Sequence, residues 1–69
     1  MNEIYIKDDY IKLGQAMKLG GMVSSGVEAK VEILDGNVLV NGQMEIQRGK
    51  KLREGDIIEF NGESARICK

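Results

Sequence analysis

The stretch SGVEAKVEILDGNVLVNG, residues 25–42, contains the signals for a helix, a strand and the turn that ends each of them. Ser25 and Glu28 have the spacing of a capping box, in which serine hydroxyl and glutamate carboxylate accept hydrogen bonds from backbone amides that lack a partner within the helix. This spacing predicts a helix over Val27–Asp35. Gly36 follows directly and can take the left-handed conformation that closes a helix.

A β-hairpin is expected immediately after this helix. Val38–Val40 is an extended run of aliphatic residues, and Asn41 with Gly42 forms the dipeptide that tolerates positive φ in a tight turn. The return strand is expected over Gln43–Ile46, because polar and apolar side chains alternate there.

The N-terminal third predicts a strand and a further helix. Glu3–Ile6 alternates in polarity and indicates a short strand. Asp8 or Asp9 is expected to cap a helix over Tyr10–Leu19, because a carboxylate there satisfies free amide donors and suits the positive end of the helix dipole. Gly20 is expected to end this helix.

The C-terminal third predicts a second hairpin, with a turn at Glu54–Asp56, a strand over Ile57–Phe60, a hairpin turn at Asn61–Gly62 and a last strand over Ser64–Cys68. The expected fold class is α+β: two packed helices against a small, mostly antiparallel sheet of four or five short strands. All 69 residues are expected to form one domain. The predicted core residues are Ile6, Leu13, Met17, Ala29, Ile33, Val38, Val40, Leu52, Ile58 and Phe60. The four methionines are also expected to fill gaps in this core.

The order of these signals resembles the RNA-binding domain named after the fourth small-subunit ribosomal protein, here called the S-four-type domain. The resemblance covers roughly Ile11 to Phe60 and rests on Ser-x-x-Glu-Ala-Lys, the glycine-closed helix and Gly-x-Val-x-Val-Asn-Gly. It implies recognition of structured RNA through the sugar-phosphate backbone. A standalone copy further implies a ribosome-associated accessory factor that acts on ribosomal RNA, with a role in assembly.

The charge of the chain is unevenly distributed. The formal net charge of −1 and the pI of about 5.3 do not by themselves indicate a polyanionic partner. Residues 47–53, however, contain four basic side chains and no acidic one: Arg48, Lys50, Lys51 and Arg53. Such a cluster attracts phosphate locally, because charges further than about 8 Å away are screened at physiological salt. Gly49 allows a ligand to approach the backbone, and Leu52 is expected to anchor the segment in the core.

The resemblance and the charge pattern together predict the RNA contacts. Phosphate contacts are assigned to Lys18, Lys30, Arg48, Lys50 and Lys51, and hydrogen bonds to Gln15, Ser24, Ser25 and Asn41. Ser25 and Asn41 also have structural explanations, as a cap and a turn residue, and the stem of Lys30 could simply cover apolar surface. Many members of the family carry an arginine where this chain has Gly26, so the chain is expected to rely on residues 48–51.

Catalytic arrangements are largely absent from the sequence. There is no histidine, and the single cysteine, Cys68, cannot form a thiolate metal site by itself. We therefore expect a binding module without enzymatic activity, cofactor or metal, present as a monomer. The lack of a long apolar run or a signal peptide predicts a cytoplasmic location.

Two other interpretations fit parts of the sequence. A β-grasp sulfur carrier has a similar length and similar turns, but it needs a C-terminal Gly-Gly, whereas this chain ends in Arg-Ile-Cys-Lys. The second is a protein-interaction module that docks on a ribosomal or enzymatic partner through the Ile11 side of the first helix. Unlike RNA binding, that interaction should survive neutralisation of Lys50 and Lys51.

Overall fold

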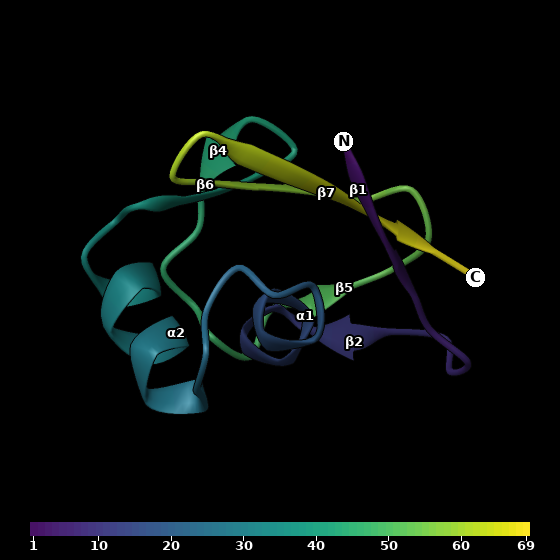
Figure 1. The fold of residues 1–69 in the computed structure, drawn as a ribbon, viewed down its shortest axis with the longest axis horizontal. Coiled ribbons are helices and arrows are strands. Elements are labelled where there is room, and N and C mark those ends of the chain that lie inside the picture. Colours follow the sequence, from purple (N-terminus) through teal and green to yellow (C-terminus); the bar gives the residue numbers. More distant parts are fainter.

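The computed structural model describes residues 1–69 and contains two helices and seven short strands (Figure 1). In chain order the elements are β1 (Asn2–Tyr5), β2 (Ile11–Lys12), α1 (Leu13–Leu19), α2 (Gly26–Leu34), β3 (Val38–Val40), β4 (Gln43–Met44), β5 (Lys51–Leu52), β6 (Ile57–Phe60) and β7 (Glu63–Cys68). Five strands form one sheet in the order β1-β7-β6-β3-β4, and β2 pairs with β5 as a separate two-stranded ribbon. The predicted α+β class, with two helices and a mostly antiparallel sheet, is confirmed.

The first and last strands lie side by side at one edge of the sheet. β1 pairs with β7 in parallel, with Ile4 opposite Ile67, whereas all other strand pairs are antiparallel. In the view of Figure 1 the purple β1 crosses the yellow β7. Parallel strands that are far apart in the chain are not joined by a tight turn, so no turn motif indicates that they pair. The sequence therefore predicted the two strands but not their pairing.

Both helices cover the same side of the five-stranded sheet, and the core lies between them and the sheet (Figure 1). Eight of the ten predicted core residues are buried, while Ile6 and Phe60 are only partly buried and pack against the core's edge. The prediction for the methionines was half wrong. Met17 and Met22 are buried, but Met1 and Met44 are exposed. The buried apolar side chains that neither prediction included are Ile4, Ala16, Val23, Ala65 and Ile67.

Helix α2 begins with the predicted capping box. The Ser25 hydroxyl accepts a hydrogen bond of 3.1 Å from the Glu28 amide, and the Glu28 carboxylate accepts bonds of 2.7 and 2.9 Å from the amide and hydroxyl of Ser24. The helix begins and ends one residue earlier than predicted, with Asp35 as its C-cap. Gly36 has a φ of +80°, as expected of the residue that closes the helix.

Helix α1 begins at Leu13 rather than Tyr10, and the predicted cap by Asp8 or Asp9 is wrong. The N-cap residue is Lys12, which makes no side-chain capping bond. Asp9 binds the ammonium group of Lys69 at 2.9 Å instead. The amides of Leu13 and Gly14 at the start of α1 instead donate to the carbonyl groups of Lys50 and Arg48, and local capping signals cannot predict such distant partners.

The two hairpins follow the predicted turns. Asn41 and Asn61 both have a φ of +53°, and each is followed by a glycine with positive φ. The return strand β4 is shorter than predicted, because it ends at Met44 and leaves Ile46 exposed. Neither α1 nor α2 has the length and apolar character that a bilayer-spanning helix requires.

Candidate nucleic-acid interface

The β2–β5 ribbon holds residues 47–53, here called the basic segment, against the start of α1. Ile11 pairs with Leu52, and Lys12 pairs with Lys51. Leu52 is fully buried, which confirms the predicted anchor. The amide of Leu13 also donates a 2.8 Å hydrogen bond to the carbonyl oxygen of Lys50, so helix start and basic segment form one ordered unit.

Gly14 and Arg48 are in close contact at this junction. The Gly14 amide donates a 3.1 Å hydrogen bond to the carbonyl oxygen of Arg48. A Cβ atom on Gly14 would lie 2.7 Å from Cγ and 3.2 Å from Cδ of Arg48. The aliphatic part of the arginine side chain therefore rests on the bare glycine backbone, which limits where the guanidinium group can go.

An open hollow of about 340 Å³, here called the basic groove, lies next to this contact. It is lined by Lys12, Gly14, Gln15, Lys18, Gly26, Arg48 and Gly49. The lining includes no hydrophobic residue, and none of its three cationic side chains forms a salt bridge. A groove with unpaired cations and exposed glycine backbone suits phosphate oxygens better than an apolar ligand.

The start of α2 forms one side of the basic groove. Gly26 is the first residue of this nine-residue helix, and no atom lies within 4 Å of the position that a Cβ atom would occupy there. The positive end of the helix dipole adds to the field of the cations. The groove thus combines residues from β2, α1, α2 and the basic segment.

The groove brings together three of the nine predicted contact residues, namely Gln15, Lys18 and Arg48. Lys30, Lys50 and Lys51 are exposed but do not line it. Lys30 lies one turn beyond Gly26 on α2. Lys50 contributes its carbonyl group to the start of α1.

The predicted hydrogen-bonding residues outside the groove already have partners within the chain. Ser24 and Ser25 are engaged with Glu28 in the capping box. The side-chain amide of Asn41 donates a 3.0 Å bond to Asp56, and its oxygen accepts a 2.9 Å bond from the amide of Ile57. The structural explanations of Ser25 as a cap residue and of Asn41 as a turn residue therefore hold.

The prediction missed Lys12, which lines the groove between α1 and the ribbon. The expected helix over Tyr10–Leu19 placed Lys12 on a helix surface without a partner. Its position depends on the cross-strand pairing with Lys51, which no local signal indicates.

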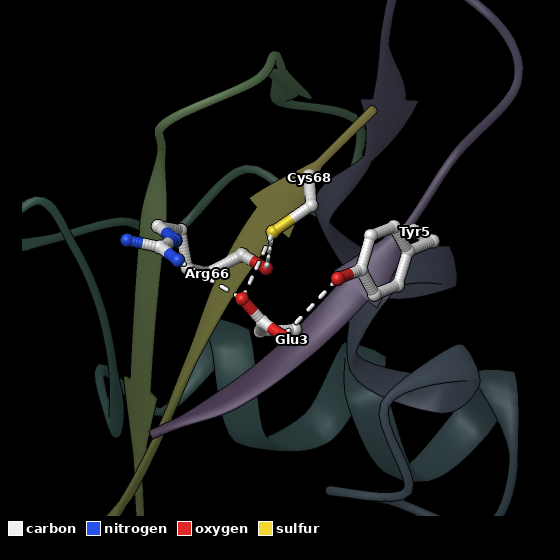
Figure 2. A network of polar contacts seen from close by, with 4 residues as sticks. All are labelled: Glu3, Tyr5, Arg66 and Cys68. Atoms are coloured by element: carbon white, nitrogen blue, oxygen red, sulfur yellow. Dashed lines mark hydrogen bonds and ion pairs between the residues drawn. The ribbon is translucent and has the colours of Figure 1, made fainter.

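The outer face of the five-stranded sheet differs from the basic groove in its charge. Glu3 accepts hydrogen bonds from Arg66 at 2.9 Å and from the Tyr5 hydroxyl at 3.2 Å, and the Cys68 thiol lies 3.8 Å away (Figure 2). The bond from Arg66, followed by that from Tyr5, lowers the pKa of Glu3. Because Arg66 is already paired, this face offers no free cation comparable to those of the groove.

The chain belongs to the S4 domain family, whose model matches residues 4–68. It is 41% identical over 61 residues to the Bacillus subtilis protein named "Probable ribosome maturation protein RlbA", covering 88% of this chain and 86% of that protein. It is 33% identical over 61 residues to the Escherichia coli "Putative RNA-binding protein YbcJ", covering 88% and 87% of the two chains.

A solved structure shows the same fold. The solution structure of YbcJ from E. coli, described as revealing an "ALFAL motif involved in RNA-binding", is similar with a TM-score of 0.77 and 30% identity. The similarity covers 100% of this chain and 89% of that one. The resemblance read from residues 11–60 thus extends over nearly the whole chain.

Proposed function

We propose that this chain binds structured RNA, in particular ribosomal RNA, through sugar-phosphate contacts in the basic groove. The observation that carries this proposal is the convergence of Lys12, Lys18 and Arg48 on one hollow without any acidic partner. Gln15 and the backbone at Gly49 provide polar groups between these cations.

The groove favours backbone contacts over base recognition. No aromatic side chain lines it, so it offers no platform on which unpaired bases could stack. Folded or double-stranded RNA is recognised mainly by shape and by phosphate and 2′-hydroxyl contacts, because side chains cannot read its deep major groove. The slight net negative charge does not oppose this mode, since the acidic side chains lie outside the groove lining.

The names of the relatives support a role connected with the ribosome. One is named as a ribosome maturation protein and another as an RNA-binding protein. We infer that this chain acts in ribosome maturation as a cytoplasmic, monomeric binding module without catalytic activity.

The test is a binding titration with a fluorescent ribosomal RNA stem-loop at several salt concentrations. The Lys18→Gln/Arg48→Gln variant should bind roughly 10- to 100-fold more weakly, because each side chain makes a charge-assisted hydrogen bond to phosphate. A plot of log K against the logarithm of the salt concentration should become shallower by about 0.7–0.9 for each phosphate that the variant no longer neutralises. Arg66→Gln is a control for the loss of a positive charge elsewhere, because it removes one from the far face of the sheet.

Unchanged affinity in the double variant would contradict the proposal. If the chain bound ribosomal particles but none of several folded RNAs at low salt, this result would favour docking on a protein partner instead. The predicted surface for such docking would need revision, because Ile11 lies in β2, half-buried against the core, and not on helix α1.

A further inference from the structure

We propose that Tyr10 holds a second row of phosphate-binding side chains beside the basic groove. The row, here called the Tyr10 row, consists of Tyr10, Lys12, Lys51 and Arg53. This inference rests on the proposed function, because it concerns a second run of phosphates in the same RNA.

Tyr10 lies directly before β2 and contacts two cations of the basic segment. The Nζ atom of Lys51 lies 4.9 Å from the centroid of the Tyr10 ring, and Cζ of Arg53 lies 5.9 Å from it. Both distances are within the range of cation–π attraction. An aromatic ring with two cations against it restricts side chains that would otherwise sample many rotamers in solvent.

The Tyr10 row contains an arrangement that is unfavourable in the free protein. Lys12 and Lys51 are direct cross-strand partners in the β2–β5 ribbon. Like charges that lie directly opposite in an antiparallel pair repel each other. Neither lysine forms a salt bridge, and neither does Arg53. A bound phosphate between these side chains would relieve the repulsion, which explains why such a cluster suits a polyanion.

The Tyr10 row is continuous with the basic groove. A neighbouring hollow of about 460 Å³ contains Tyr10 and shares Lys12 and Gln15 with the groove. Asp8 and Asp9 also line this second hollow, and Asp9 is paired with Lys69. The cross-strand pairing of Lys12 with Lys51 therefore links the basic groove to the Tyr10 row, and the two aspartates lie beside Tyr10 and Lys12.

Tyr10 acts as a positioning residue in this arrangement, because its ring orients Lys51 and Arg53. Tyr10 is 39% exposed and belongs to no buried cluster, so replacing its side chain should leave the fold intact. The phenyl ring of Tyr10→Phe retains the cation–π contacts, whereas Tyr10→Leu retains only apolar bulk.

The experiment compares RNA affinity and its salt dependence for Tyr10→Phe, Tyr10→Leu and Arg53→Gln, with Arg66→Gln as the charge control. Amide NMR spectra establish that each variant is folded. Arg53→Gln should bind roughly three- to tenfold more weakly, with a salt slope lower by about 0.7–0.9. Tyr10→Phe should stay within about twofold of wild type, and Tyr10→Leu should bind about threefold more weakly with a reduced slope.

The outcomes separate this inference from the proposed function. Suppose that Arg53→Gln and Tyr10→Leu both keep wild-type affinity and salt slope, while Lys18→Gln/Arg48→Gln binds weakly. This result would overturn the Tyr10 row and leave the groove as the interface. If Tyr10→Phe bound as weakly as Tyr10→Leu, the hydroxyl group would be the contact, and the positioning role would be wrong. If Tyr10→Leu failed to fold, Arg53→Gln and Lys51→Gln would decide by their salt slopes.

Discussion

The amide of Gly14 donates a 3.1 Å hydrogen bond to the carbonyl oxygen of Arg48, and the Arg48 side chain occupies the space beside the bare Gly14 backbone. This contact joins the start of α1 to a segment more than thirty residues later in the chain. It positions a cationic side chain at the basic groove and simultaneously satisfies a free amide of the helix.

Gly14→Ala should therefore weaken RNA binding while the protein stays folded. The new methyl group would lie 2.7 Å from Cγ of Arg48, so the arginine side chain must leave its present position at the groove. We expect roughly a three- to tenfold loss of affinity, approaching that of Arg48→Gln. Gly49→Ala is the matched control, because Gly49 also lines the groove but has no atom near its Cβ position. Equal losses in the two variants would contradict this explanation.

Gly26→Arg should strengthen RNA binding. The position lines the groove, lies in open space and begins a helix, so a long cationic side chain fits without a clash. One further phosphate contact should raise affinity roughly three- to tenfold and increase the salt slope by about 0.7–0.9. Gly26→Glu should have the opposite effect in the same titration. An arginine variant with wild-type affinity and slope would show that RNA does not reach the start of α2.

The sequence-based predictions were accurate where an element is fixed by neighbouring residues and inaccurate where it is fixed by residues distant in the chain. Helix α2 was predicted to within one residue, because its capping box and closing glycine lie next to it in the chain. The start of α1 was misplaced, because its amides bind the carbonyl groups of Arg48 and Lys50. The parallel pairing of β1 with β7 depends on equally distant contacts.

The same distinction applies to the candidate site. The charge pattern identified the basic segment, and Arg48 does line the groove. Lys12 was missed, since its place depends on pairing with Lys51 across the ribbon. Asn41 was proposed as an RNA contact, but its side chain is occupied by Asp56 and Ile57.

Leu52→Ala should destabilise the protein by about 2–5 kcal/mol, the usual range for removing a buried leucine side chain. Leu52 is fully buried and anchors the basic segment opposite Ile11. Urea denaturation measures the effect. Ile46→Ala is the control, because Ile46 is exposed, and it should change the free energy of unfolding by no more than about 0.5 kcal/mol. If Leu52→Ala lowered the free energy of unfolding as little as the control does, Leu52 would not anchor the basic segment.

The stabilising effect of Glu28 should depend on pH. Hydrogen bonds from the amide and hydroxyl of Ser24 lower the pKa of the Glu28 carboxyl below its usual value near 4.5. A carboxyl whose pKa is lowered on folding stabilises the protein above its unfolded-state pKa, and this contribution is lost as the pH falls through the folded-state pKa. Wild type should therefore melt at a higher temperature than Glu28→Ala at pH 7, and the difference should shrink towards pH 3. A difference independent of pH would mean that the carboxylate charge does not contribute.

The pKa of Glu3 provides a test on the far face of the sheet. Arg66, followed by Tyr5, lowers this pKa through hydrogen bonds. A carbon-detected NMR titration should find the Glu3 pKa below the usual value for glutamate, and Arg66→Gln should raise it. An unchanged Glu3 pKa in the variant would indicate that the bond to Arg66 is absent in solution.

The central claim is that RNA lies in the basic groove, and an amide NMR titration with a ribosomal RNA stem-loop tests it most directly. We predict shifts at Gly14, Gln15, Lys18, Gly26 and Gly49 that weaken as salt is added, with no shifts at Glu59 and Ser64 on the outer face of the sheet. Shifts centred on that outer face, or none at low salt, would contradict the claim.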